Sequence, residues 1–163
     1  MKSRRKKARD RAPKRVSRRT SPSEPKQSSS EVKPRIGVEA VVERTVTHEW
    51  TIQHLNPDLP PVFSTPAMIG LMEHATVLAV LPELPPGFIT VGTRIEVDHL
   101  KAVAPGAPVR AWGRLVGYRG RFLVFDVEAS SGEHVIGRGR VFRAIVNPEQ
   151  HKQRAQSRTP RQS

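Results

Sequence analysis

The feature that most constrains this chain is a long apolar segment that runs from Thr65 to Val80 between helix-breaking residues. Thr65 at the N-cap followed by Pro66 is a favourable helix start, because the missing N–H of proline would be unpaired in the first turn anyway. The proline-rich run 81–87 ends the helix. Ten apolar residues leave almost no polar face: Ala67, Met68, Ile69, Leu71, Met72, Ala75, Val77, Leu78, Ala79 and Val80. Such a helix must be buried on most of its sides.

The segments around this helix predict a sheet that buries it. One strand candidate precedes the helix, and four follow it; their ranges are 38–48, 88–100, 108–118, 121–129 and 134–146. Short hairpin-type links join the last four, at Pro105-Gly106, Arg119-Gly120 and Ser131-Gly132. We therefore predict an α+β fold in which an antiparallel meander makes a sheet of about five strands around one long buried helix.

Charge and apolar content divide the chain of 163 residues into three parts. Residues 1–33 hold 13 Lys and Arg against 3 acidic residues, and residues 147–163 hold 4 against 1. Both tails have too little apolar surface to offset the entropy of ordering. We predict that residues 1–33 are a disordered basic tail, that 34–146 form a single domain without net charge, and that 147–163 are a flexible basic tail.

The composition also restricts partners and location. The basic tail 1–33 could attract nucleic acid, anionic lipid or another acidic partner, or it could be a solvated extension, because no aromatic residues interleave with its charges. We expect no membrane span, since no apolar run approaches about 20 residues. The chain has no cysteine, which excludes disulfides and thiolate metal sites. The expected location is the cytoplasm.

Two polar side chains, Glu73 and His74, interrupt the apolar helix. A carboxylate on a mostly buried helix costs several kcal/mol unless it is paired or protonated, which makes Glu73 a candidate for acid–base chemistry. The alternative is that Glu73 pairs with an arginine or caps a backbone group. His74 is more typical of a rim or packing residue.

The predicted strand 88–100 supplies a second candidate, His99. Apart from Thr93, its odd positions before His99 are apolar. A period of two therefore places His99 on the side that faces the helix, with Arg94, Glu96 and Asp98 on the other side. A lone histidine there is more often a packing residue, but opposite Glu73 it becomes a candidate for catalysis. Gly92 interrupts the strand and indicates either a bulge or the close approach of a ligand.

These residues lie in runs that resemble the fluoroacetyl-CoA thioesterase-like branch of the hotdog superfamily. The similar runs are Val62-Phe63-Ser64-Thr65-Pro66-Ala67-Met68-Ile69-Gly70-Leu71-Met72-Glu73, Val91-Gly92-Thr93, Asp98-His99-Leu100, Gly106, Arg121-Phe122-Leu123-Val124-Phe125 and Ile136-Gly137-Arg138-Gly139. The resemblance covers roughly residues 38–146. Its most specific part is spacing, with 8 positions from Thr65 to Glu73 and 26 from Glu73 to His99.

The resemblance implies an acyl-CoA thioesterase that acts on a small acyl-CoA or related thioester and forms a homodimer with sites at or near the subunit interface. It implies Thr65, Glu73 and His99 as catalytic residues and Gly92 as a residue near the thioester carbonyl. Glu73 would be nucleophile or general base. His99 would protonate the leaving thiolate or position water, and Thr65 would orient Glu73 or bind the thioester. No cofactor beyond the CoA thioester substrate is implied.

The sequence leaves several alternatives open. A helix that starts at Thr65 separates it from Glu73 by about 12 Å of axis, so the helix begins later, the substrate lies between them, or one residue comes from a neighbouring subunit. Candidates for binding the CoA phosphates are Arg94, Arg119 and Arg121. A metal site has no support, because the six histidines show no ligand-pair spacing.

Two other functions compete with hydrolysis. One is a hotdog hydratase or dehydratase acting on enoyl or hydroxyacyl thioesters. The other is a non-catalytic hotdog module that binds acyl-CoA, or one that the basic tail 1–33 recruits to nucleic acid.

Overall fold

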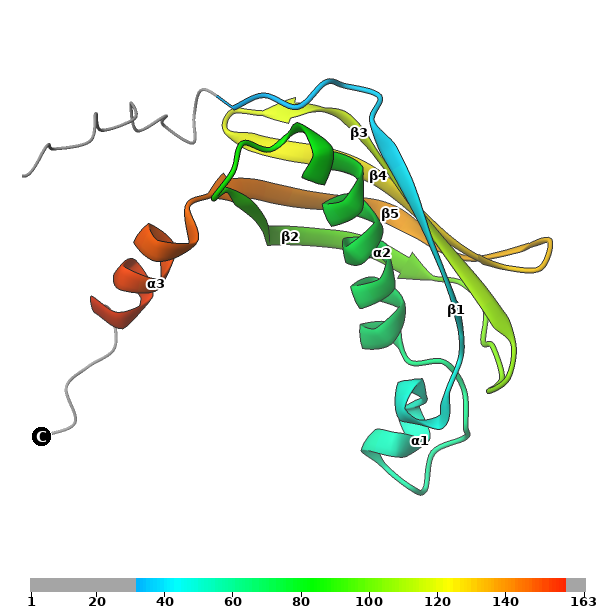
Figure 1. Ribbon diagram of the computed structural model, residues 1–163. Coiled ribbons are helices and arrows are strands. Elements are labelled where there is room, and N and C mark those ends of the chain that lie inside the picture. The colour runs from blue at the N-terminus through cyan, green and yellow to red at the C-terminus, as the bar shows by residue number, and fades with distance from the viewer. Residues whose placement is uncertain (1–31, 158–163) are drawn as a thin grey trace, which may run out of the picture.

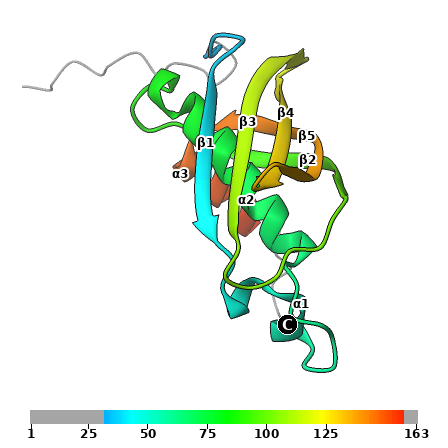
Figure 2. The same ribbon diagram turned by 90° about the vertical axis from the view of Figure 1, so that its right-hand side faces the viewer.

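The computed structural model describes residues 32–157, in which one curved antiparallel sheet encloses a long helix (Figure 1). The strands are β1 (Glu39–Thr45), β2 (Ile89–His99), β3 (Pro108–Arg119), β4 (Phe122–Ser131) and β5 (His134–Val146). The helices and single turns are η1 (His48–Trp50), α1 (Ile52–Leu55), α2 (Thr65–Val80), η2 (Leu81–Glu83) and α3 (Pro148–Ser157). Figure 2 shows α2 crossing behind the strands along the inside of the curve. The predicted α+β architecture of five strands around one long helix is confirmed.

The start of α2 differs from the prediction by one residue. Ser64, not Thr65, is the N-cap: its backbone is extended and its side chain accepts a hydrogen bond from the Ala67 N–H at 3.3 Å. Thr65 is therefore the first helical residue, followed by Pro66. Since capping uses the hydroxyl of Ser64, the hydroxyl of Thr65 is available for another contact.

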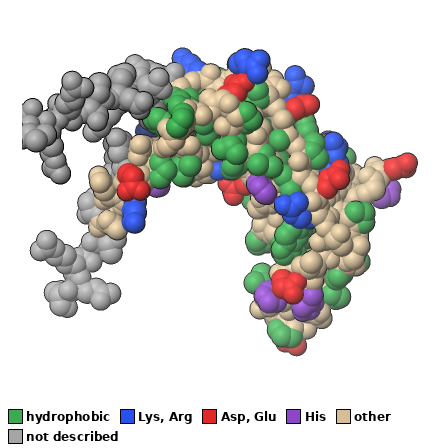
Figure 3. Space-filling model, in the orientation of Figure 1, with side chains coloured by type: hydrophobic (Ala, Val, Ile, Leu, Met, Phe, Trp, Pro, Cys, Tyr) green, Lys and Arg blue, Asp and Glu red, His purple; other side chains and the backbone are tan. Residues whose placement is uncertain are grey.

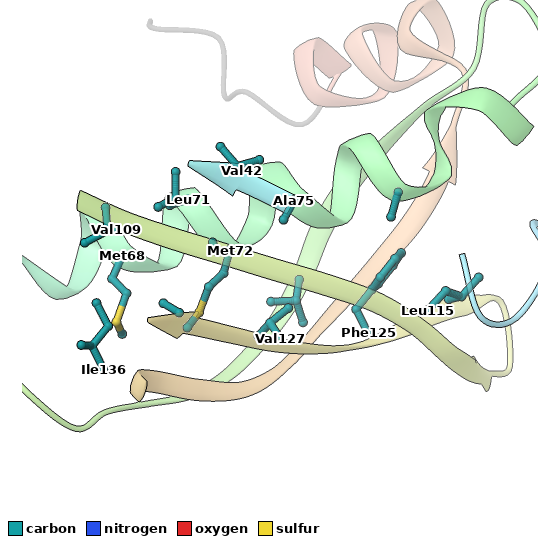
Figure 4. Packing of buried hydrophobic residues seen from close by; sticks show 14 of the residues in the cluster. Val42, Met68, Leu71, Met72, Ala75, Val109, Leu115, Phe125, Val127 and Ile136 are labelled. Atoms are coloured by element: carbon teal, nitrogen blue, oxygen red, sulfur yellow. The ribbon is translucent and has the colours of Figure 1, made fainter. Parts of the chain in front are cut away.

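The core lies between α2 and the concave face of the sheet. Met68, Met72 and Ala75 have no exposed surface, and Figure 4 shows the two methionines pointing from the helix toward Ile136 and Val127. Burial of each of the larger side chains stabilises the folded state by roughly 1.5–3 kcal/mol. This burial is the main reason why a helix without a polar face is stable here.

Among the described residues, one helical segment, Thr65–Glu83, is long and apolar enough to cross a bilayer, with 19 residues and a mean hydropathy of 1.2. The expectation that no apolar run approaches this length is wrong for this segment. Since Met68 and Met72 are fully enclosed by the sheet, the segment serves as the core helix of the domain.

The strand order is β1-β3-β4-β5-β2, which differs from a simple meander. The predicted hairpin at Pro105-Gly106 is wrong, because β2 pairs with β5 and the chain then crosses to the other side of the sheet before β3. The place beside β3 is taken by β1, and Gly106 N–H donates to the Val46 carbonyl at 2.8 Å just beyond β1. The hairpins at Gly120 and Gly132 form as predicted, and both glycines have a positive φ.

The C-terminal segment, predicted as a flexible tail, contains a helix that the sequence did not predict, since Pro148–Ser157 forms α3. The Asn147 side chain accepts a hydrogen bond from the Glu149 N–H at 3.0 Å, which caps the first turn. Figure 1 shows α3 projecting away from the end of β5. The predicted tail 1–33, up to residue 31, and residues 158–163 lie outside the described residues.

The close packing of β2 on β5 predicts a strong effect of a methyl group at Gly139. A Cβ there would collide with the backbone of Glu96 and Val97, so Gly139→Ala should lower the free energy of unfolding by about 1–3 kcal/mol. Gly70→Ala is the matched control, because a Cβ on this exposed helical glycine meets no atom within 4 Å and should add about 0.5–1 kcal/mol. Urea denaturation of both variants measures the difference. Equal stabilities would contradict the observed packing.

Candidate active site

The first pair of candidate side chains joins the start of α2 to the end of β2. Thr65 Oγ1 lies 2.9 Å from His99 Nδ1, within hydrogen-bond distance. The other ring nitrogen, Nε2, is buried and has no hydrogen-bond partner among the described residues. Buried polar atoms are normally paired. His99 is therefore held through Nδ1, while Nε2 is the atom that a substrate or another group could engage.

The second pair lies two turns further along α2. Glu73 Oε1 accepts a hydrogen bond from Arg143 Nη1 at 3.1 Å. The Arg143 side chain is only 6% exposed and that of Glu73 is 31% exposed. The alternative in which Glu73 pairs with an arginine is the arrangement that the structure has, so the helix does not carry a lone buried carboxylate.

Arg143 is fixed from the other side by β2. Its Nε donates to Thr90 Oγ1 at 2.9 Å and its Nη2 donates to the Thr90 carbonyl at 3.0 Å. Burial lowers the pKa of Arg143 from its ordinary value, and the charge of Glu73 acts in the opposite direction. An arginine nevertheless remains protonated at neutral pH. Three hydrogen bonds thus hold a charged guanidinium under the Glu73 carboxylate.

Gly92 lies at a bulge in β2, as one of its two interpretations predicted, and the group that lies against its backbone is the side chain of Glu73. The pairing of β2 with β5 shifts register between Gly92 and Arg94, which is a bulge. A Cβ at Gly92 would also collide with Glu73 Oε1, so the carboxylate lies directly against the glycine backbone. Only glycine allows this close approach.

The bulge changes which residues of β2 face the helix. Before it, the even position Thr90 contacts Arg143. After it, the odd positions Val97 and His99 contact the core and Thr65. The predicted helix-facing row of odd residues is therefore wrong before the bulge and right after it, because a bulge inserts one extra residue and inverts the alternation.

An open hollow of about 530 Å³ lies beside the carboxylate of Glu73. Besides Glu73, its lining consists of the consecutive β2 residues Gly92, Thr93, Arg94 and Ile95. β2 is the last strand of the sheet, so the hollow opens at a sheet edge. Of the arginines considered for CoA phosphates, only Arg94 lines it, whereas Arg119 and Arg121 flank the turn between β3 and β4.

A single chain brings the candidates together in two pairs. Thr65 meets His99, and Glu73 meets Arg143 against Gly92. Because α2 begins at Thr65, about 12 Å of helix axis separates it from Glu73, and a later helix start is excluded as an explanation. In the described part of the chain, no three His, Asp or Glu residues are grouped so as to hold a metal ion.

Arg143 is the residue that sequence reasoning missed. It stands in the run Val141-Phe142-Arg143-Ala144-Ile145, which is otherwise apolar. A charged residue in a run that reads as a buried strand was the available signal, because buried charges are nearly always paired. His74, by contrast, is exposed on α2, in keeping with a rim residue.

Comparison with known proteins gives consistent matches. The family described as "Fluoroacetyl-CoA-specific thioesterase" matches residues 43–149. A fluoroacetyl-CoA thioesterase of Streptantibioticus cattleyicolor is 36% identical over 132 residues, which are 77% of this chain and 95% of that protein. A solved structure of the fluoroacetyl-CoA thioesterase FlK is 35% identical, with a TM-score of 0.72, and covers 78% of this chain and 99% of its own. A hot-dog-like protein from Thermanaerovibrio acidaminovorans has a TM-score of 0.72 at 22% identity, over 83% of this chain and 100% of its own, a likeness in fold.

The network around Arg143 predicts a stability difference between two arginines of the sheet. Arg143→Met removes the hydrogen bonds to Glu73 and Thr90 inside the domain, so it should lower the free energy of unfolding by about 1–3 kcal/mol. Arg110→Met removes an exposed pair with Glu43 at 3.5 Å and should have little effect. Urea denaturation compares the two. Equal losses of stability in the two variants would mean that the buried contacts of Arg143 stabilise the fold no more than an exposed ion pair does.

Proposed function

Because the chain belongs to the family of fluoroacetyl-CoA-specific thioesterases and is a thioester hydrolase, we propose that it hydrolyses a small acyl-CoA or related thioester with Thr65, Glu73 and His99. The predicted family and hotdog fold are confirmed by these matches. The preference of the relatives for a fluorinated acyl group is not part of the proposal. Water and the CoA thioester are the only reactants, without a metal or a further cofactor.

The observation that carries this proposal is the position of the Glu73 carboxylate. It lies against the backbone of Gly92 beside an open hollow, and Arg143 binds one of its oxygens. A guanidinium pairs with the charged form of the carboxylate, which is the form that a nucleophile or a general base requires. The other oxygen, Oε2, has no hydrogen-bond partner among the described residues, so it can attack the thioester carbonyl or take a proton from water. Both roles remain part of the proposal.

His99 and Thr65 would act on the leaving group. If the Thr65 hydroxyl donates to Nδ1, the ring proton resides on Nε2, the nitrogen without a described partner. From this neutral ring, Nε2–H can donate a hydrogen bond to the departing CoA thiolate as the bond between the acyl carbon and sulfur breaks. If the ring is instead protonated on both nitrogens, Nδ1–H donates to the Thr65 hydroxyl, and Nε2–H can transfer its proton to the thiolate and leave a neutral imidazole. In the opposite tautomer, Nε2 would accept a hydrogen bond from the attacking water. Backbone N–H groups beside Gly92 could stabilise the oxyanion, an effect often worth about 3–4 kcal/mol.

We propose a homodimer as the assembly that completes the site. The two pairs lie about 12 Å apart along α2 within one chain, so joining Glu73 to His99 at one carbonyl favours a contribution from each of two subunits. β2 is an edge strand beside the hollow, and its Ile89 and Ile95 are 43% and 41% exposed. An exposed, partly apolar edge strand is a template for pairing with another chain.

The proposal predicts large losses of activity from two substitutions. In a thiol-release assay over a panel of acyl-CoA substrates, Glu73→Gln and His99→Ala should each lower kcat at least about 100-fold, because proton transfer typically contributes that much. The matched controls are Glu43→Gln and His134→Ala, since both residues are exposed; they should retain wild-type kcat. Full activity in either site variant would remove that residue from the proposed mechanism.

Gly92 gives an independent prediction. Gly92→Ala forces the Glu73 carboxylate to move, because the new Cβ would occupy its place. We expect kcat to fall at least tenfold while circular dichroism shows an intact fold, since small displacements at a reacting centre cost large factors in rate. Gly117→Ala is the control, because a Cβ there meets no atom within 4 Å. Unchanged kcat for Gly92→Ala would show that the position of the carboxylate is unimportant.

A further inference from the structure

The free edge of β2 carries side chains whose directions follow from its pairing with β5, because residues directly opposite each other in an antiparallel sheet point to the same side. Ile95 is opposite Val141, which is fully buried, so Ile95 points to the concave side of the sheet, where it is 41% exposed. Arg94 is opposite Phe142, and its guanidinium carbon lies 5.5 Å from the centroid of that ring, so Arg94 points to the convex side. The edge therefore has an apolar side and a charged side.

On the convex side, two charges at this edge form an ion pair. Arg94 binds Glu96, two positions further along the strand, and their side chains are 54% and 43% exposed. The β5 residue opposite Glu96 is Arg140, but Arg140 pairs with Asp126 at 3.1 Å. The edge thus presents one positive and one negative group that are both accessible to another chain.

On the concave side, the surface beside this edge is apolar. Figure 3 shows hydrophobic side chains exposed over α2, and Leu78 of this helix is 36% exposed. No described strand pairs with β2 on the side away from β5. An unpaired strand edge beside exposed apolar surface is a template for pairing with another chain.

Side-chain direction and charge select one way of pairing this edge with a second copy of the chain. Homo-oligomers most often have two-fold symmetry, and a slip by one residue would set concave-side against convex-side residues. The two-fold axis must therefore pass between one residue and its own copy.

The charges decide which residue lies at the axis. With the axis at Ile95, Arg94 lies opposite Glu96 of the partner subunit, and Glu96 lies opposite the partner's Arg94. With the axis at Arg94 or at Glu96, two like charges would lie opposite each other, which is destabilising. With the axis at Val97, Glu96 would lie opposite the partner's Asp98, again with like charges. Opposite charges therefore favour the axis at Ile95.

The pairing at Ile95 also brings the separated halves of the candidate site together. Within one chain, Gly92 and His99 are seven positions apart, which is roughly 23 Å along the strand. Three positions separate Gly92 from Ile95, and four separate Ile95 from His99. Since the partner strand runs in the reverse direction, the partner's His99 lies about one position, or roughly 3.3 Å along the strands, from Gly92. Glu73 lies against Gly92, so the partner's His99 approaches its carboxylate on the concave side.

We propose that two copies of this chain pair along antiparallel β2 strands with Ile95 opposite Ile95 of the partner subunit, so that Glu73 of each subunit acts with the partner's His99. Two pairs of Arg94 with Glu96 join the subunits on the convex side, and the two Ile95 side chains meet on the concave side. Because the axis is perpendicular to the joined sheet, α2 of both subunits lies on its concave side. The joint action of Glu73 and His99 rests on the proposed function, whereas the register rests on the charges and side-chain directions of β2.

The register can be tested by cross-linking, because the chain has no cysteine of its own. In this pairing, Ile95→Cys places two thiols opposite each other, with Cα atoms about 4.5–5.5 Å apart, which is within the range for a disulfide. Mild oxidation should therefore give a covalent dimer on a non-reducing denaturing gel. The controls are Thr93→Cys and Val97→Cys on the same strand. Each control thiol lies about four positions, or roughly 13 Å, from its copy, and should give no covalent dimer.

The charges can be tested by exchanging them, with sedimentation equilibrium as the measurement. Arg94→Glu sets acidic groups opposite each other twice, so it should raise the dissociation constant of the dimer about tenfold. The double variant Arg94→Glu/Glu96→Arg restores opposite charges and should return the dissociation constant to within about threefold of wild type. Arg110→Glu is the matched control, because Arg110 is equally exposed at 54% and pairs with Glu43 of β1 at the other edge of the sheet. It should change the dissociation constant less than about twofold.

Three results would overturn the proposal. The first is a covalent dimer through Thr93→Cys or Val97→Cys in place of Ile95→Cys, and the second is no covalent dimer in any of the three variants. The third is equal weakening of the dimer by Arg94→Glu and Arg110→Glu. Neither measurement requires thioester hydrolysis. A chain that cross-links through Ile95→Cys but hydrolyses no thioester would contradict the proposed function and support this interface, whereas an active chain that does not cross-link there would contradict the interface alone.

Discussion

The constraint on which the molecule depends is the enclosure of α2, because a helix without a polar face is stable in water only when other elements cover it. The curved sheet supplies most of this cover, and Met68 and Met72 are fully buried beneath it. Where α2 faces β2 and β5, the contact between helix and sheet is polar: Arg143 of β5 binds Glu73 of α2 and is itself hydrogen-bonded to Thr90 of β2. The candidate site therefore occupies the side of α2 where the apolar core ends.

Within this site, glycine geometry and one buried charge determine where the carboxylate lies. Gly92 has no side chain to exclude Glu73, and Arg143 binds it from below. Ser64 contributes indirectly: because its hydroxyl caps α2, the hydroxyl of Thr65 can reach His99. The capping of α2 by Ser64 and the packing of Glu73 against Gly92 thus position two polar pairs, which lie two turns apart on one helix. In the homodimer that we propose, two subunits would bring both pairs to one thioester.

The helix and strands could be predicted closely from the sequence, because breakers and periodicity are local signals. The helix Thr65–Val80 begins one residue earlier than predicted and ends where expected, and five strands form near their expected positions. The place of β2 beside β5 could not be predicted this way, since strand order depends on contacts between distant segments. Arg143 was missed for the same reason: its partner is 70 residues away in sequence. Spacing selected Thr65, Glu73 and His99 as candidates and already indicated about 12 Å of helix between Thr65 and Glu73, but it could not indicate that Thr65 pairs with His99 and Glu73 with Arg143.

The most direct test of the account is complementation between two inactive variants. Glu73→Gln and His99→Ala subunits are mixed, unfolded and refolded together, and thioester hydrolysis is measured against each variant refolded alone. If Glu73 of one subunit and His99 of another act on the same carbonyl, each mixed dimer regains one intact site. Since random pairing makes half of the dimers mixed, activity should recover to about a quarter of wild type, far above the residual rate of either variant. Activity no higher than that of the separate variants, with mixed dimers demonstrated by mass spectrometry, would contradict the shared site.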